Sequence, residues 1–395
     1  MARTFILTND FPPRRGGIES FVKTMADKLA ALGESDNGIE SGVVVYTASM
    51  PGSPSVDAAC KYPVIRDKTG TLLPTKRVEH DVVRAFTDSN CDRVLIGSSV
   101  PLGLLAPALR AAGAERIVAL THGHEVMYAR TPGLRNMLRQ VGDAVDYLTA
   151  VTKWTRRKIG QALTPEVARS KQVLLAPGID TTMFYPGCGG DEVRARLGIS
   201  PQTPVVVCVA RANPRKGQDR LISAWPEVLE KVPNARLVLV GDGKHLDTLH
   251  RQASHLGLGT GVGHGGVTPV IFVGSVPREE VPAYMDAGDV FAMLCRSHPL
   301  GFAEGIGTVF LEAAACGKPL IVGRSGGAPE TVLDGESGYV VNPHDISQIA
   351  ARIVELLQNP ARAREMGERG REFVLSKHTL DQTAAELARL LGVTS

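Results

Sequence analysis

Short runs of β-branched apolar residues alternate with longer amphipathic segments along almost the whole chain of 395 residues. A short apolar run with polar or glycine residues on either side is typical of a buried strand, whereas apolar residues three or four positions apart are typical of a helix. In the segment 18–32, for example, Phe21, Met25 and Leu29 fall on one helical face. Strands of this kind separated by helices predict parallel sheets that are covered by helices on both faces.

The alternation is interrupted once, by the strand-poor segment 178–190, and then resumes. The predicted strands are 4–8, 43–47, 94–97, 117–121, 147–151 and 173–176 before the interruption, and 205–210, 237–240, 270–273, 290–294, 320–322 and 339–341 after it. A chain of this length is expected to form about two domains. We therefore predict an α/β protein with two doubly wound, Rossmann-like domains, residues 1–185 and 186–377. The last segment, about 378–395, contains an amphipathic helix that is able to pack back on the first domain.

The expected place for chemistry follows from this architecture. Ligands of open parallel sheets bind beyond the carboxyl ends of the strands. We expect the two domains to face each other across a cleft, with the functional side chains in the loops that follow the strands.

The composition excludes several other classes of protein. Hydrophobic residues make up 43% of the chain and charged residues 22%, without low-complexity tracts, which is typical of a globular protein and not of a disordered or fibrous one. No apolar run approaches the ~20 residues that cross a bilayer, and the first residues contain no signal-peptide core, so we expect a cytoplasmic protein. Among the cysteines, Cys208, Cys295 and Cys316 lie in apolar stretches and are expected to be small buried residues.

The two halves of the chain differ in charge. Residues 1–185 contain 23 Lys and Arg against 18 Asp and Glu, whereas residues 186–395 contain 21 against 23. The surplus of positive charge in the first half favours an anionic surface or ligand. It is too small, and has too few aromatic residues between the basic ones, for a nucleic-acid-binding surface.

A loop with two glycines, residues 9–17, follows the first predicted strand and precedes the first long helix. Gly16 and Gly17 would let backbone N–H groups approach an anion at the start of that helix, where the helix dipole favours negative charge. An ordinary tight turn between a strand and a helix would look the same, so the residues alone leave both interpretations open.

Basic residues occupy the corresponding loop in the second half. Arg211 and Lys216 lie between the predicted strand 205–210 and the next helix. An Arg fork and a Lys point charge at such a place are suited to hold phosphate oxygens. The alternative is that both are ordinary solvated loop residues.

Two glutamates accompany a glycine-rich helix start. Glu304 precedes Gly305 and Gly307, and Glu312 lies eight residues beyond Glu304, about two helical turns away and on roughly the same face. A helix start of this kind suits a diphosphate, and carboxylates beside it suit sugar and ribose hydroxyls. The alternative is an exposed pair of glutamates on an amphipathic helix.

The segment 121–125, THGHE, ends a predicted strand of the first half. His122 and His124 share a face of that strand and would suit zinc, but a third ligand at a suitable spacing is not evident, and a structural histidine is a further alternative. The stretch 261–266 fits G-x-G-x-x-G, yet it precedes a predicted strand, whereas a dinucleotide fingerprint follows one. We therefore interpret 261–266 as a flexible loop.

These motifs together resemble those of the retaining GT-B glycosyltransferases of family 4. Glu304 and Glu312 are similar to the E-x7-E motif of that family, and the pair of Arg211 and Lys216 is similar to its donor-phosphate pair. A more specific resemblance is to the GDP-mannose-dependent phosphatidylinositol mannoside mannosyltransferases of mycobacteria and corynebacteria. The stretches that carry it are TNDFPPRRGGIES, THGHE, ARANPRKGQD, DVFAMLCRS, EGIGTVFLEAAACGKP and GGAPETV.

The resemblance implies a set of site residues. The implied catalytic residues are His122, Arg211, Lys216 and Glu304. The residues implied to bind the donor are Gly16, Gly17, Arg211, Lys216, Gly241, Val273, Glu304, Gly305, Ile306, Gly307, Thr308 and Glu312. The residues implied to bind the acceptor are Asn9, Asp10, Arg14, Arg15, His124 and Arg296, and no residue is assigned to a metal.

The implied function is transfer of mannose from GDP-mannose to an inositol phospholipid acceptor, through an alpha-1,6 linkage and without a metal or other cofactor. A lipid acceptor implies peripheral attachment to the anionic inner face of the plasma membrane, for which Arg14, Arg15 and the segment 154–158 are candidates. One alternative keeps the fold but uses another nucleotide sugar and a small soluble acceptor. Another is a Rossmann-type nucleotide-binding protein or oxidoreductase without transferase activity.

Overall fold

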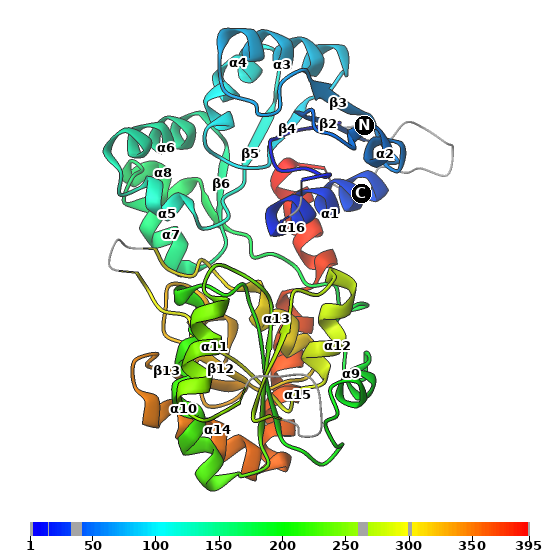
Figure 1. The fold of residues 1–395 in the computed structure, drawn as a ribbon. Coiled ribbons are helices and arrows are strands. Elements are labelled where there is room, and N and C mark those ends of the chain that lie inside the picture. Colours follow the sequence, from blue (N-terminus) through cyan, green and yellow to red (C-terminus); the bar gives the residue numbers. More distant parts are fainter. Residues whose placement is uncertain (1–2, 15, 33–41, 260–267, 299–301, 394–395) are drawn as a thin grey trace. The chain divides into compact units, whose positions relative to one another are not determined.

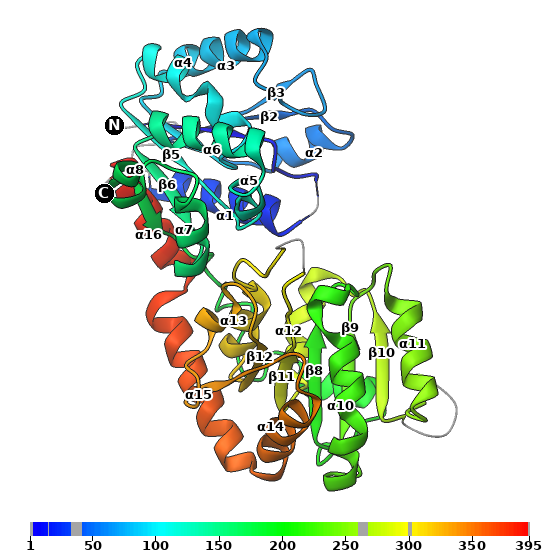
Figure 2. The same cartoon turned by 90° about the vertical axis from the view of Figure 1, so that its left-hand side faces the viewer.

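The computed structural model describes residues 3–14, 16–32, 42–259, 268–298 and 302–393. The chain divides into two compact units, Met1–Pro177 with Asp381–Ser395, and Gly178–Leu380. Figures 1 and 2 show that each unit is a sheet with helices on both faces.

The sheet of the first unit has seven parallel strands in the order β3-β2-β1-β4-β5-β6-β7. The strands are β1 (Thr4–Thr8), β2 (Val43–Ala48), β3 (Val64–Asp67), β4 (Arg93–Ile96), β5 (Arg116–Ala119), β6 (Tyr147–Ala150) and β7 (Gln172–Leu174). The helices between them are α1 (Gly17–Leu32), α2 (Ser53–Ala58), α3 (Lys76–Asp88), α4 (Ala106–Ala111), α5 (Glu125–Tyr128), α6 (Pro132–Ala144), α7 (Lys153–Gly160) and α8 (Pro165–Ser170).

The central strands of this sheet are apolar on both sides, as parallel strands under two helical layers must be. Every residue of β1 and β2 is buried. Phe5 of β1 packs edge-on against Phe86 of α3 with a distance of 5.7 Å between ring centroids. Such burial supplies the main favourable free energy of the unit.

The sheet of the second unit has six parallel strands in the order β10-β9-β8-β11-β12-β13. These are β8 (Val205–Val209), β9 (Arg236–Val240), β10 (Val270–Gly274), β11 (Val290–Met293), β12 (Leu320–Gly323) and β13 (Gly338–Val341). The helices are α9 (Gly190–Arg196), α10 (Gln218–Lys231), α11 (Leu246–His255), α12 (Val281–Asp286), α13 (Thr308–Ala315), α14 (Ile346–Gln358) and α15 (Pro360–Lys377). Both sheets thus have the Rossmann strand order, in which the order reverses beside the first strand. The predicted pair of doubly wound, parallel sheets is confirmed.

The chain passes between the units at two places that lie side by side. Ile179 forms a parallel bridge with Thr379, and its backbone N–H donates to the carbonyl of His378 at 2.7 Å. These contacts hold residues 178–185, which the sequence placed in the first domain, on the second unit. Beyond them the last helix, α16 (Leu380–Leu391), lies on the first unit, where the Thr383 hydroxyl donates to the Ala176 carbonyl at 3.1 Å (Figure 1).

Strand β3 was not predicted from the sequence. It is an edge strand, and it contains Arg66 and Asp67 in place of a continuous apolar run. The Arg66 guanidinium donates to the Pro12 carbonyl at 2.7 Å and pairs with the Asp57 carboxylate at 2.7 Å. Strand β3 therefore braces the loop between β1 and α1.

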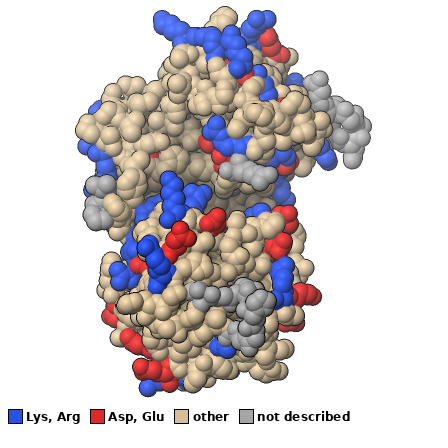
Figure 3. Space-filling view, in the orientation of Figure 1, with Lys and Arg blue, Asp and Glu red and all other residues tan. Residues whose placement is uncertain are grey.

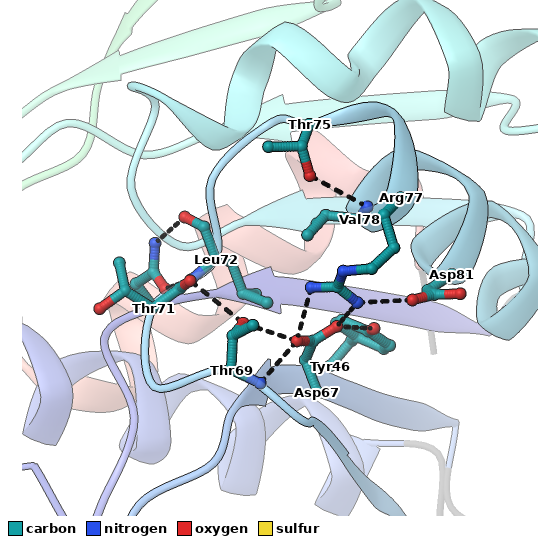
Figure 4. A network of polar contacts seen from close by, with 10 residues as sticks. Tyr46, Asp67, Thr69, Thr71, Leu72, Thr75, Arg77, Val78 and Asp81 are labelled. Carbon is teal, nitrogen blue, oxygen red and sulfur yellow. Dashed lines mark hydrogen bonds and ion pairs between the residues drawn. The ribbon is translucent and has the colours of Figure 1, made fainter.

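Asp67, the last residue of β3, is the centre of a polar network (Figure 4). Its carboxylate accepts hydrogen bonds from the Tyr46 hydroxyl at 2.9 Å, from the Thr69 backbone N–H at 2.8 Å and from the Arg77 guanidinium at 3.0 Å. Burial alone would raise the pKa of the Asp67 carboxyl, but the hydrogen bonds from Arg77 and Thr69 outweigh burial and lower this pKa well below its usual range. The network fixes the loop 68–75 beside the end of β1.

Replacing Asp67 by Asn is expected to lower the free energy of unfolding at pH 7 by about 1–3 kcal/mol, because the variant leaves buried donors without a charged acceptor. The lowered pKa means that the charged carboxylate contributes its full stability above about pH 4, and that this contribution is lost as the pH falls toward the folded-state pKa. Denaturant unfolding of both proteins between pH 7 and pH 3 measures this.

The matched control is Asp81→Asn, which removes a half-exposed partner of the same Arg77 and should cost only about 0.5 kcal/mol. Equal stability of Asp67→Asn and the wild type at pH 7 would show that the network is not a stabilising one.

Candidate functional site

In the second unit the strand order reverses between β8 and β11, and open parallel sheets bind ligands at the carboxyl edge beside such a reversal. The loops that follow these two strands meet closely there. Gly217, with φ of 76°, lies so near the carbonyl oxygen of Leu294 that a Cβ there would be 2.1 Å from it. Only glycine fits this position, and the loop carrying Arg211 and Lys216 is therefore fixed to the end of β11.

An ion pair between Lys216 and Glu304 lies at this edge of the sheet. The Lys216 ammonium donates to the Glu304 carboxylate at 2.6 Å, and neither side chain is more than a quarter exposed. The Cys295 thiol donates to the same carboxylate oxygen at 3.6 Å. The structure thus brings together a cation from the connection between β8 and α10 and a carboxylate and a thiol from the connection between β11 and α13.

Burial by itself would lower the pKa of the Lys216 ammonium, but the charge of Glu304, the neighbouring Cys295 and the hydrogen bond to Glu304 together outweigh burial, so the pKa is raised and Lys216 stays protonated. Burial raises the pKa of the Cys295 thiol, and the neighbouring Glu304 charge raises it further. Cys295 is therefore a neutral donor at physiological pH and not a thiolate.

Glu304 is held in place through its backbone. Gly327 donates its N–H to the Glu304 carbonyl at 2.8 Å, and a Cβ on Gly326, where φ is 59°, would lie 2.0 Å from the same oxygen. The loop after β12 thus supports the Glu304 backbone from below. The stretch GGAPETV, which contains Gly326 and Gly327, contributes to the family resemblance, but the sequence does not predict this supporting role.

The sequence predicts that Glu304 and Glu312 lie on one helical face, and this prediction is wrong. Helix α13 begins at Thr308, so Glu304 lies in the loop before it and Glu312 in its second turn. Glu312 is buried and pairs with the Arg278 guanidinium at 2.5 Å. Arg278 is not among the predicted site residues, although it lies beyond the carboxyl end of β10, where side chains that bind ligands are expected.

The other donor-site candidates of the second unit lie at the same edge. Arg211 is exposed directly beyond β8, Gly241 directly follows β9, and Val273 lies near the end of β10. Gly305, Ile306, Gly307 and Thr308 form the entry to α13. Arg296 is engaged elsewhere, because its guanidinium binds both carboxylate oxygens of Asp219 at 3.0 and 2.8 Å.

In the first unit, the loop after β1 carries Gly16 and Gly17 to the start of α1. A Cβ on Gly17 would meet no atom within 4 Å, so packing within this unit does not require glycine there. The Asn9 amide exchanges two hydrogen bonds with the backbone of Leu72, at 2.9 and 2.7 Å. Arg14 donates to the Gly70 carbonyl at 3.4 Å, and Arg15 lies outside the described residues.

The THGHE segment follows β5 at the carboxyl edge of the first sheet. The His122 Nε2 is 2.6 Å from the Gly97 carbonyl oxygen. Glu125, fully buried, accepts hydrogen bonds at 3.0 Å from the backbone N–H groups of His122 and Gly123. Glu125 therefore sets the path of the backbone, and the His122 and His124 rings stack with centroids 6.3 Å apart.

A cavity of about 190 Å³ opens beside this segment, with Asp10, Ser98, His124 and Tyr128 among its lining residues. Burial raises the pKa of the Asp10 carboxyl, as does the negative charge of Glu19, while His122 acts in the opposite direction. A carboxyl, a hydroxyl and an imidazole around one small cavity suit a polyhydroxylated ligand.

Among the described residues, no three His, Cys, Asp or Glu side chains gather where they would hold a metal ion. The glycine-rich stretch 261–266 lies outside the residues that the structure describes.

Comparison with known proteins decides the family. Residues 190–373 match the family described as "Glycosyl transferases group 1". Over 98% of its length the chain is 41% identical to the GDP-mannose-dependent alpha-(1-6)-phosphatidylinositol monomannoside mannosyltransferase of Mycolicibacterium smegmatis, 97% of which is covered. The chain belongs to the group 1 glycosyltransferases. The predicted family and the predicted enzyme class are thereby confirmed.

Two further comparisons extend this result. The glycosyltransferase is 36% identical, over 98% of its chain, to the GDP-mannose-dependent monoacylated alpha-(1-6)-phosphatidylinositol monomannoside mannosyltransferase of Corynebacterium glutamicum, 97% of which is covered. The solved structure of Anabaena Alr3699/HepE in complex with UDP aligns over 100% of both chains with a TM-score of 0.78 and 20% identity. This likeness confirms the two Rossmann-like domains of the GT-B fold.

Within the described part of this glycosyltransferase, no helix combines the length and apolar character needed to cross a bilayer.

Replacing Gly326 by Ala is expected to displace the Glu304 backbone and to lower glycosyl transfer at least tenfold, because its Cβ would overlap the Glu304 carbonyl. The matched control is Gly335→Ala. Gly335 also has a positive φ, 80°, but its Cβ would meet no atom within 4 Å, so this variant carries the backbone strain alone. Initial rates and thermal melting of both variants give the comparison, and equal rates would contradict the role assigned to Gly326.

Proposed function

We propose that this enzyme transfers mannose from GDP-mannose to a phosphatidylinositol monomannoside, with an alpha-1,6 linkage and retention of anomeric configuration. The proposal draws its donor and acceptor from relatives that bear these names and match nearly the whole chain. The observation in the site that supports it is the Lys216–Glu304 pair at the reversal of strand order, directly before the start of α13.

The donor diphosphate is proposed to lie at the start of α13. When the bond between the sugar and the diphosphate breaks, negative charge grows on the leaving phosphate while the sugar becomes cationic. Lys216 supplies a fixed positive charge that Glu304 keeps protonated, and Arg211 supplies a second one. The backbone N–H groups of Gly305, Ile306, Gly307 and Thr308 add the positive end of a helix dipole. Fixed charges of this kind stabilise the transition state without reorganisation.

Glu304 is proposed to hold the sugar, since its carboxylate can accept from sugar hydroxyls beside the phosphate. Glu312, oriented by Arg278, is proposed to accept from the ribose hydroxyls. Gly241 and Val273, at the ends of β9 and β10, would border the nucleoside. The ends of four neighbouring strands, β10, β9, β8 and β11, would then bind the parts of one nucleotide sugar.

The first unit is proposed to bind the acceptor. Gly17 has no packing reason to be glycine, which supports a close approach of substrate to its backbone. His122, fixed by the Gly97 carbonyl, is proposed to lie beside the donor sugar. Asp10 and His124 are proposed to bind hydroxyls of the acceptor in their common cavity.

The remaining acceptor candidates are proposed to act in two different ways, through other residues or by direct contact. Asn9 and Arg296 are proposed to act indirectly, because their side chains hold the neighbouring loops. Arg14 and Arg15 remain proposed contacts to the anionic acceptor. We also propose that transfer needs no metal ion and that the enzyme works as a peripheral protein on the inner face of the membrane, where its lipid acceptor lies.

A donor panel tests the function directly. The purified enzyme is incubated with phosphatidylinositol monomannoside in detergent and with GDP-mannose, UDP-glucose, UDP-N-acetylglucosamine or ADP-glucose, and the lipid products are weighed by mass spectrometry. We expect one added hexose from GDP-mannose, at an unchanged rate in excess EDTA. A product from another donor alone would contradict the assigned donor, and a loss of rate in EDTA that Mg²⁺ or Mn²⁺ restores would contradict metal independence.

Arg211→Ala and Lys216→Ala are each expected to lower kcat/KM by about 10²–10³, because each removes one preorganised charge from the leaving diphosphate. Arg211→Ala is the cleaner variant, since Arg211 is exposed and its removal should leave the melting temperature unchanged. Lys231→Ala, which removes an exposed cation from the far end of α10, is the control and should retain full activity. Rates of both variants near that of the control would exclude these two residues as the phosphate clamp.

A further inference from the structure

A second pocket on the first unit lies apart from the residues assigned above. It is a groove of about 410 Å³ between α7 and α8, over the edge strand β7, and its lining includes Lys153, Arg156, Arg157, Gln161 and Gln172. In Figure 3, Lys and Arg side chains stand at the edge of the first unit where α6 to α8 lie.

The charge of this groove has one sign. Arg156 and Arg157 lie three and four positions after Lys153 on α7, so each neighbours Lys153 on the helix surface, and the described lining of the groove contains no carboxylate. Like charges at this spacing repel each other, so the arrangement weakens the helix unless an anion lies between them. Two guanidinium forks and an ammonium suit a phosphate group in particular.

A buried amide gives an independent indication of a ligand. Gln172, the first residue of β7, lines the groove and is only 4% exposed. Its Nε2 donor is buried and has no hydrogen-bond partner among the described residues. Gly160 of α7 leaves room for this amide, because a Cβ there would lie 2.8 Å from the Gln172 Oε1. A buried donor without a partner is costly and calls for a reason.

We propose that this groove binds the phosphate of an anionic phospholipid headgroup and so anchors the enzyme at the membrane. The choice of a lipid as the source of that phosphate rests on the proposed function, which requires the enzyme to work on a lipid acceptor. Trp154, the aromatic residue of the candidate segment 154–158, packs against the apolar core of the unit. Attachment at this edge would thus depend on headgroup binding and not on insertion of an aromatic ring.

Vesicle co-sedimentation at low ionic strength tests the proposal, with phosphatidylcholine vesicles that do or do not contain phosphatidylglycerol. The test variant is Arg156→Gln with Arg157→Gln. The control is Lys158→Gln with Arg169→Gln, which removes the same number of charges from α7 and α8 at positions outside the lining of the groove. We expect the test variant to bind anionic vesicles about 25-fold more weakly than the wild type, roughly fivefold for each charge, and the control less than threefold more weakly.

The variant Gln172→Leu tests whether the Gln172 amide binds a ligand or has only a structural role. Removing an unpaired buried donor should raise the melting temperature by a few degrees, while the loss of a donor to phosphate should weaken vesicle binding about tenfold. A more stable protein with weaker binding is the expected result. Equal losses in the test and control variants, or unchanged binding by Gln172→Leu, would overturn the proposed site.

Two further measurements on the wild type identify the source of the phosphate and separate this proposal from the proposed function. Glycerol 3-phosphate is added as a competitor at concentrations up to about 1,000 times that of the vesicle phosphate. Persisting vesicle binding supports a headgroup at a surface, and complete displacement at equal concentration would assign the groove to a soluble phosphate ester. Mannose transfer in detergent is measured in parallel. Vesicle binding that depends on the groove, without mannose transfer, would contradict only the proposed function. Mannose transfer without such vesicle binding would contradict only the proposal that the groove binds a headgroup.

Discussion

The reversal of strand order between β8 and β11 is the constraint on which the polar site of the second unit depends. It separates two neighbouring loops just where each leaves the sheet, and Gly217 ties them together below the gap. Lys216 and Glu304 meet above this tie at 2.6 Å, although they are 88 residues apart in the chain. Because each depends on the other, neither charge can be considered alone. Glu304 keeps Lys216 protonated in a partly buried place, and Lys216 keeps a carboxylate there from standing uncompensated.

In the first unit, too, a loop at the edge of the sheet is held in position by polar contacts. The loop between β1 and α1 carries exposed glycines and is supported from the side by polar contacts. Arg66 holds Pro12, and the loop that the Asp67 network fixes presents Leu72 to Asn9. A site at the edge of a sheet thus rests on polar contacts from the neighbouring strands. These contacts are directional, so they fix the position of a loop more closely than apolar packing does.

Much of the fold could be predicted because buried parallel strands require continuous apolar runs, and the helices between them require amphipathic ones. Strand β3 escaped because an edge strand tolerates charges such as Arg66. Lys216 could be indicated because it follows a predicted strand, and Glu304 because it precedes a glycine-rich helix start, but their pairing with each other could not be predicted. Nothing in the sequence says that Arg296 pairs with Asp219 or Glu312 with Arg278, since charge pairs between distant segments leave no local pattern. The supposed common face of Glu304 and Glu312 failed because the helix starts at Thr308, after the glycines.

The two adjacent crossings between the units have a consequence for how the protein is made. Helix α16, the last helix of the chain, belongs to the first unit, while residues 178–380 form the second unit in between. A ribosome therefore completes the second unit before it releases α16, whose Leu387, Leu390 and Leu391 are buried in the finished structure, so the nascent first unit lacks this apolar contact until then. Folding of the first unit is finished only after the second unit has been synthesised, so a chaperone that shields apolar surfaces would have its longest opportunity on the first unit and not on the second.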